Sequence, residues 1–110
     1  MIQVMDTDAQ LLEEVIARLT AAARPARVIV FGSMAAGTAT ADSDLDLLVL
    51  FDEVDDERRE SVRLRRALRG VGMPVDIIVM LTKRFEETKG VIGGIAYPAS
   101  KYGRVVYEAA

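Results

Sequence analysis

Three aspartates occupy strand-like positions in otherwise apolar stretches of the sequence. Asp44 and Asp46 stand one residue apart where an apolar run begins, and Asp76 enters the next run one residue after its start. Successive side chains of a strand point to opposite faces, so Asp44 and Asp46 share a face. Adjacent carboxylates repel each other, and each would cost several kcal/mol if it were buried unpaired. We therefore expect Asp44, Asp46 and Asp76 to converge on a divalent cation.

A loop suited to binding phosphate precedes the first two aspartates. Gly32 follows an apolar run and permits a tight turn or a close approach of the backbone to a ligand. Ser33 heads a short predicted helical turn, where free N–H groups and the helix dipole attract anions. Together with the carboxylates, this is the layout of a two-metal nucleotidyl-transfer site. One Mg²⁺ would carry a triphosphate there, and the other would activate an attacking hydroxyl.

The composition excludes several other chemistries. The 110 residues include no cysteine and no histidine, which excludes Cys/His zinc sites, thiol nucleophiles and His-based triads. The remaining candidate ligands, carboxylates and hydroxyls, suit Mg²⁺ or Mn²⁺. The glycines match neither the G-x-x-x-x-G-K-[ST] P-loop nor the G-x-G-x-x-G dinucleotide fingerprint.

The net charge and the hydropathy of the sequence limit the kinds of partner and the cellular location that we expect. The net charge is −3 and the isoelectric point is about 4.9, which argues against a broad nucleic-acid-binding surface. No apolar run reaches the length of about 18 residues that spans a bilayer. No N-terminal stretch has the pattern of a signal peptide. We therefore expect a cytoplasmic protein that contacts no membrane.

The periodicity predicts one α/β domain over residues 1–110, with helices packed on a small sheet. Thr7 and Gln10 form a candidate capping box for the first helix, which ends before Pro25. Residues 91–101 are ambiguous, because two glycines and a proline interrupt a helical spacing. The predicted helices cover residues 8–22, 33–36, 55–69 and 82–89, and the predicted strands cover residues 27–31, 45–51, 75–81 and 104–107.

The helix predicted over residues 55–69 is heavily charged. Its arginines are assigned no function, because such residues commonly form a solvated face, although a basic strip could meet an acidic partner. The positions expected to point inward are Val62, Leu64, Ala67, Leu68 and Val71.

The order of these motifs resembles a known family. Gly32-Ser33, a ten-residue gap, Asp44-Leu45-Asp46 and the later Asp76 resemble the DNA polymerase β-type nucleotidyltransferase superfamily. The stretch VIVFGSMAAGTATADSDLDLLVLF, residues 28–51, and the ending at residues 104–108 are most similar to its minimal nucleotidyltransferase (MNT) domains. The resemblance implies a nucleotidyltransferase fold, with an α-β-α-β-α-β core and a small mixed sheet flanked by helices.

The resemblance also implies roles for individual residues and partners. Asp44 and Asp46 would hold both Mg²⁺ ions, and Asp76 would complete the second metal site and help deprotonate the acceptor hydroxyl. Gly32 and Ser33 would contact the phosphates of ATP or another NTP. Many minimal members act as the antitoxin of a small all-helical HEPN protein, some by transferring AMP to one of its tyrosines. The resemblance therefore implies a HEPN-type partner, beside the alternative of a homo-oligomer.

The chain departs from the family at the residues that follow Gly32-Ser33. Many relatives carry arginines where this chain has Met34 and Ala36. We therefore expect either weaker binding of the nucleotide or of the partner, or substitution by other cations such as Lys83, Arg84 or Lys101. A second hypothesis is thus a non-catalytic antitoxin that neutralises a helical partner by contact. The missing arginines favour that hypothesis, and the retained aspartates favour the enzyme. Transfer to a small molecule is a third, weaker alternative.

Each feature also has a purely structural interpretation. Gly32-Ser33 could form a turn and a helix cap, residues 42–44 an Asx-rich turn, and Asp76 an exposed strand end. Asp46 is harder to explain in this way because it lies inside an apolar strand. The occurrence of all these features in order favours a catalytic site.

Overall fold

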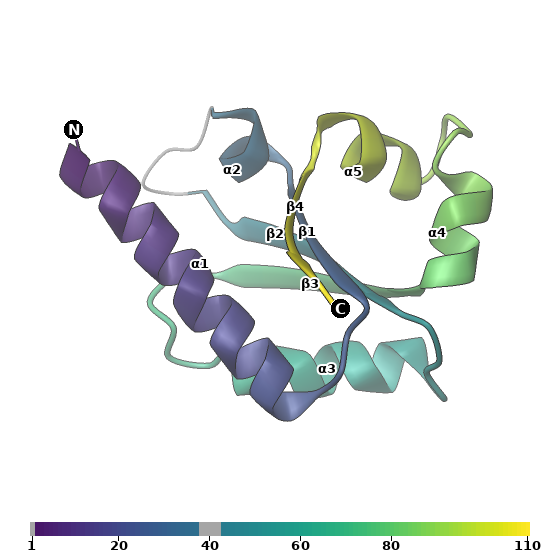
Figure 1. Cartoon of the computed structure of the whole chain (residues 1–110), viewed down its shortest axis with the longest axis horizontal. Coiled ribbons are helices and arrows are strands. Elements are labelled where there is room, and N and C mark those ends of the chain that lie inside the picture. Colours follow the sequence, from purple (N-terminus) through teal and green to yellow (C-terminus); the bar gives the residue numbers. More distant parts are fainter. Residues whose placement is uncertain (1, 38–42) are drawn as a thin grey trace.

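The computed structural model describes residues 2–37 and 43–110. A four-stranded sheet in the order β3-β2-β1-β4 forms its centre, with helices on both faces (Figure 1). The mixed α/β fold predicted from the sequence is confirmed. The elements are α1 (Ile2–Ala22), β1 (Arg27–Phe31), α2 (Ser33–Ala36), β2 (Leu45–Phe51), α3 (Glu57–Ala67), β3 (Val75–Leu81), α4 (Thr82–Thr88), α5 (Ala96–Tyr102) and β4 (Arg104–Glu108).

The sheet is mixed because of how β1 is paired. β2 and β3 run parallel to each other, whereas β1 runs antiparallel to both β2 and β4. The sheet has a buried core on each face, which explains why the central strands are continuous apolar runs. The core against α1 and α3 includes Leu47 and Val49, and the core against α4 and α5 includes Leu48 and Leu50.

Helix α1 is longer than the sequence predicted. It begins at Ile2 and not at residue 8, so the capping box assigned to Thr7 and Gln10 is wrong. Residues 2–7 contain neither proline nor glycine, and the helical backbone therefore continues through them. The apolar face of α1 lies as expected, with Val15 and Leu19 fully buried one turn apart.

Helix α3 packs its apolar side on β3. Leu64 and Leu68 are buried, as predicted, but Val62 is 38% exposed. The inward position assigned to Val62 is wrong, because a residue two positions from Leu64 lies about 200° around the helix. The helix begins at Glu57, after Asp56, whose Oδ1 accepts a hydrogen bond of 3.0 Å from the Arg59 N–H.

This cap gives a first prediction. Asp56→Ala should lower the free energy of unfolding by about 1 kcal/mol, because a free N–H group at the start of α3 loses its acceptor. Chemical denaturation monitored by circular dichroism measures the change. The matched control is Asp55→Ala, which removes a neighbouring exposed carboxylate and should change stability by less than about 0.5 kcal/mol. Equal losses in the two variants would show that general charge, and not the cap, is responsible.

The ambiguous segment, residues 91–101, lies after α4 and forms turns followed by α5. Pro98 is the third residue of α5, where the backbone N–H would have no intrahelical partner, so the proline is tolerated. Helix α4 ends at Thr88 and β4 ends at Glu108, each within one residue of its predicted end. Among the described residues, no helix is both long enough and apolar enough to cross a membrane.

Candidate active site

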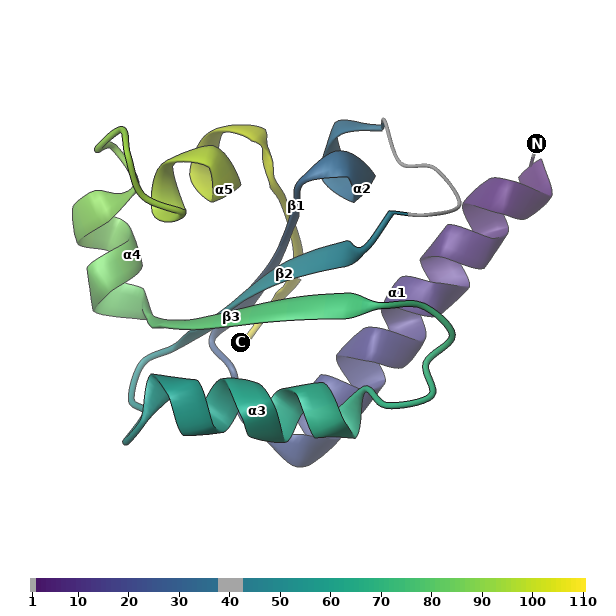
Figure 2. The ribbon, with the colours of Figure 1, turned by 180° about the vertical axis from the view of Figure 1, so that it is seen from behind.

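The topology brings the predicted site residues to one edge of the sheet. Because β2 and β3 are parallel and β1 is antiparallel to β2, the starts of β2 and β3 lie beside the end of β1 (Figure 2). Asp46 is level with Asp76 on one side and with Phe31 on the other. Strands in a sheet lie about 4.8 Å apart, so the two aspartates occupy adjacent backbone positions. Asp44 immediately precedes β2.

Gly32 lies directly against the carboxylate of Asp46. Its backbone has φ 74° and ψ −153°, a conformation that is essentially restricted to glycine. A Cβ atom on Gly32 would overlap Oδ2 of Asp46, so the site also lacks room for a side chain there. Ser33 begins the single turn of α2, which ends at Gly37 in the left-handed conformation. The predicted phosphate loop and the first carboxylates are therefore neighbours in space.

The three carboxylates influence one another electrostatically. Partial burial raises the pKa of Asp46 above its ordinary value of 3.8, and the negative charges of Asp76 and then Asp44 raise it further. Asp46 is half-buried, whereas Asp44 and Asp76 are exposed to solvent. A divalent cation would offset this disfavoured negative charge on Asp46, and the all-oxygen donor set of the aspartates suits Mg²⁺.

The side chains are not gathered into a finished metal cage. Within residues 2–37 and 43–110, no three acidic side chains are arranged closely enough to hold a metal ion. Oδ1 of Asp76 instead lies 4.0 Å from Nη2 of Arg65, and both side chains are more than half exposed. Such exposed ion pairs are worth about 0–1 kcal/mol. The adjacent backbone positions of Asp46 and Asp76, and their carboxylate oxygens, fit a divalent ion. The contact that holds the Asp76 side chain toward α3 is weak.

The structure also locates the cations expected to replace the missing arginines. Lys83 and Arg84 lie on α4, which follows the carboxyl end of β3, whereas Asp76 lies near its start. Since seven strand residues span about 20 Å, the expectation that Lys83 or Arg84 substitutes at the phosphates is wrong. Nζ of Lys101 lies 3.2 Å from the hydroxyl of Tyr97. Sequence reasoning missed Arg65, because its approach to Asp76 depends on how α3 packs against β3.

Comparisons with known proteins identify the family. The model of the nucleotidyltransferase domain matches residues 9–97, a span that includes Gly32, Ser33 and all three aspartates. The chain belongs to this nucleotidyltransferase domain family. The superfamily predicted from the sequence is thereby confirmed.

The fold of this nucleotidyltransferase domain also resembles that of a solved structure. It is described as "Crystal structure of the toxin-antitoxin with AMP-PNP", and the match has a TM-score of 0.66 and 16% sequence identity. The match covers 89% of this chain and 73% of the other. At this identity, the likeness shows a shared fold. No curated protein matches the sequence of the domain.

The raised pKa of Asp46 predicts how the stability of this nucleotidyltransferase domain changes with pH. Because the pKa is higher in the folded state than in the unfolded state, the folded state binds the proton more tightly. Stability should therefore fall as the pH rises from below 3.8 through the folded-state pKa. In EDTA, Asp46→Asn should melt at a higher temperature than the wild type at neutral pH, and the difference should shrink in acid.

Thermal unfolding at a series of pH values tests this expectation. The matched control is Asp52→Asn, which changes an exposed carboxylate just beyond the opposite end of β2. It should leave the pH dependence unchanged. A difference between Asp46→Asn and the wild type that is independent of pH would contradict the electrostatic origin.

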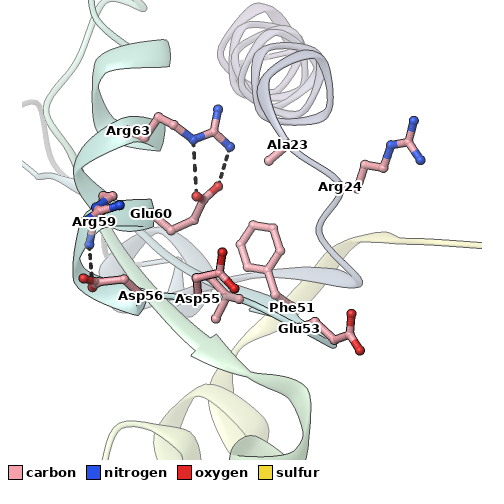
Figure 3. Close-up of a pocket in the computed structure, with 10 residues that line it drawn as sticks. Ala23, Arg24, Phe51, Glu53, Asp55, Asp56, Arg59, Glu60 and Arg63 are labelled. Atoms are coloured by element: carbon pink, nitrogen blue, oxygen red, sulfur yellow. Dashed lines mark hydrogen bonds and ion pairs between the residues drawn. The ribbon is translucent and has the colours of Figure 1, made fainter.

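A second charged region of the nucleotidyltransferase domain lies at the opposite end of β2 (Figure 3). This hollow, of about 440 Å³, includes Phe51, the last residue of β2, and side chains from the start of α3. Arg63 pairs there with Glu60 and donates a 2.7 Å hydrogen bond to the carbonyl of Ala22. Because these contacts join α3 to the end of α1, we interpret the region as structural.

Proposed function

We propose that the chain is a magnesium-dependent nucleotidyltransferase of the minimal type, formed by one domain over residues 1–110. It transfers NMP, with AMP from ATP as the simplest case, to a hydroxyl group of a protein partner. The principal support is the placement of Asp46 level with Asp76 on adjacent parallel strands. The Asp46 carboxylate also lies directly against the backbone of Gly32, which brings the proposed phosphate-binding loop beside the carboxylates.

Each site residue has a proposed role. Asp44 and Asp46 would hold Mg²⁺, and Asp76 would join them for a second ion. Bound there, Mg²⁺ supplies positive charge that neutralises the triphosphate and makes the acceptor hydroxyl easier to deprotonate. Gly32 leaves its backbone open to a phosphate oxygen, and the Ser33 hydroxyl donates a hydrogen bond to another.

The transfer is a displacement at phosphorus. The acceptor oxygen forms a bond to the α-phosphorus, the bond from that phosphorus to the bridging oxygen breaks, and pyrophosphate leaves. Asp76 lies on the edge strand β3 and is exposed, so a partner's side chain can reach it. We assign to Asp76 the acceptance of the proton from the acceptor hydroxyl.

We propose that the biological role is that of an antitoxin in the cytoplasm. The similar solved structure is described as a toxin-antitoxin with AMP-PNP, which supports both a toxin partner and an adenine nucleotide. The proposed partner is a small all-helical protein of the HEPN type, and a homo-oligomer is the alternative. This assignment rests on fold similarity and on the resemblance of the sequence to MNT domains.

A non-catalytic antitoxin is the second candidate. It is favoured by the contact between Asp76 and Arg65, by the lack of a ready three-carboxylate cluster among the described residues, and by Met34 and Ala36 in place of arginines. In this case, the domain neutralises its partner by covering it, and the carboxylates have no role in that contact.

A labelling experiment separates the two candidates. The domain is incubated with the protein encoded beside it, Mg²⁺ and ATP labelled at the α-phosphate. Label that appears on the partner and is absent in EDTA supports the transferase. Neutralisation of the partner that survives Asp44→Ala combined with Asp46→Ala, with no label from any of the common NTPs, supports the contact mechanism and overturns the enzyme.

A further inference from the structure

Helix α3 carries a hollow with three arginines beside the proposed acceptor position. The arginine hollow, as we name it, has a volume of about 390 Å³. It lies where the end of α3 meets the start of β3, two elements that run side by side (Figure 2). The residues that line it include Val62, Arg65, Arg66, Arg69, Met73 and Val75.

The positive charge of the arginine hollow is not balanced by acids of its own helix. Oε2 of Glu57 accepts a 3.1 Å hydrogen bond from the Leu81 N–H, at the far end of β3. Glu60 pairs with Arg63. Among the described residues, the arginines of the hollow form one ion pair, the 4.0 Å contact between Arg65 and Asp76. A cationic surface of this kind on a chain of net charge −3 points to an anionic ligand.

The strand order places the hollow on the acceptor side of the site. Gly32 follows β1, Asp46 lies on the neighbouring β2, and Asp76 lies on β3 at the sheet edge. Arg65 is the next charged group outward from Asp76. Across the sheet, the proposed phosphate-binding residues therefore lie toward the centre, at β1. The arginines lie beyond the edge strand β3, on the far side of Asp76, the residue proposed to accept the proton of the acceptor hydroxyl.

We propose that the arginine hollow binds an acidic segment of the acceptor protein that flanks the modified hydroxyl residue. This inference rests on the proposed function, because that function identifies Asp76 as the residue nearest the acceptor. Val62, which is 38% exposed, and the half-buried Met73 add apolar contact for a neighbouring side chain. Carboxylates of the segment would form charge-assisted hydrogen bonds with guanidinium groups that are already exposed.

The observations favour a peptide over a nucleic acid. Among the described residues, no aromatic side chain lines the hollow, so bases have no aromatic surface there on which to stack. The carboxylate of Asp76, which lies 4.0 Å from Arg65, would repel a continuous phosphate backbone. A short acidic segment can place its charges on the arginines and leave its hydroxyl beside Asp76.

Binding of labelled peptides in EDTA, without nucleotide, tests the proposal independently of catalysis. The probes contain one tyrosine flanked by glutamates, by serines or by lysines, and fluorescence anisotropy gives their affinities. The glutamate peptide should bind at least about tenfold more tightly than the serine peptide, which corresponds to 1.4 kcal/mol. Arg66→Ala combined with Arg69→Ala should weaken the binding of the glutamate peptide about tenfold.

The matched control is Arg58→Ala combined with Arg59→Ala, which removes the same charge at the other end of α3. It should change the affinity by less than about twofold. Thermal unfolding shows whether both double variants remain folded, as expected for exposed residues. Equal weakening by the two double variants would overturn the proposal, since it would reveal only general charge attraction. Tighter binding of a short oligothymidylate through Arg66 and Arg69 than of the glutamate peptide would also overturn it.

Failure of this proposal is distinguishable from failure of the proposed function. If the glutamate peptide shows the expected pattern but no NTP supports transfer to the partner, the arginine hollow stands as an acidic-peptide site and the enzyme is rejected. If the wild type transfers the label and the Arg66→Ala, Arg69→Ala variant has an unchanged KM for the partner, the enzyme stands and the hollow is rejected as its acceptor site.

Discussion

Asp46→Ala should reduce nucleotidyl transfer by at least about 10²–10³-fold, the range seen when one preorganised electrostatic group is removed from an active site. Asp46 is the half-buried member of the carboxylate group. Partial burial and then the charges of Asp76 and Asp44 raise its pKa, so a bound ion would stabilise its negative charge. The measurement is the rate of label transfer from ATP to the partner at saturating Mg²⁺.

Asp52→Ala is the matched control for activity. It removes an exposed aspartate just beyond the carboxyl end of β2, and it should retain the wild-type rate. Asp46→Asn distinguishes charge from shape, because it nearly preserves the side-chain volume and should be as inactive as Asp46→Ala. We expect the asparagine variant to be more stable than the wild type in EDTA, as sites built for function commonly reduce stability. Transfer at the wild-type rate by Asp46→Asn would remove Asp46 from the site.

Gly32→Ala should destabilise the fold by about 3 kcal/mol, the sum of a strained backbone and a steric overlap. The backbone of Gly32 has a positive φ of 74°, and a Cβ atom there would meet Oδ2 of Asp46. Urea denaturation measures the loss. Displacement of the Asp46 carboxylate should also weaken Mg²⁺-dependent binding of ATP.

Gly37→Ala provides a close comparison. Gly37 also has a positive φ, 76°, but among the described residues, its chain neighbours aside, no heavy atom lies within 4 Å of its Cβ position. The substitution should cost only about 1–2 kcal/mol, which is the price of the left-handed conformation. In a double-mutant cycle, Asp46→Ala should relieve part of the cost of Gly32→Ala by at least about 0.5 kcal/mol. Equal costs at Gly32 and Gly37, with no coupling to Asp46, would show that the carboxylate does not occupy the space beside Gly32.

Strands β1, β2 and β3 could be predicted from the sequence because their side chains are buried on both faces of the sheet. β1, β2 and β3 are apolar runs bounded by glycine, aspartate or proline, and both faces of the sheet are covered, so the run and the strand coincide. The start of α1 could not be predicted in the same way. A candidate capping sequence at Thr7 competes with continued helix, and local sequence does not decide between them. The structure of residues 91–101 could not be predicted either, because α5 depends on its tertiary packing. Its buried residues, Ala96 and Ala99, show no strong hydrophobic periodicity in the sequence.

The candidate site was predictable only where it depends on local geometry. The turn at Gly32 follows from glycine's freedom, and strand alternation is the basis for expecting Asp44 and Asp46 on one face, although Asp44 immediately precedes β2. Asp76 lies level with Asp46 because β2 and β3 are parallel neighbours, and no local sequence pattern predicts that pairing. The same limit explains why Lys83 was considered as a substitute for the missing arginines and why Arg65 was missed.

Isothermal titration calorimetry with a non-hydrolysable ATP analogue tests the central claim, that Asp44, Asp46 and Asp76 hold a divalent ion that carries a nucleoside triphosphate. We predict saturable binding in Mg²⁺, at least about tenfold weaker in EDTA, and lost in Mg²⁺ when Asp44 and Asp46 are both replaced by asparagine. Binding of equal strength with and without Mg²⁺, or binding unchanged by that double substitution, would contradict the claim.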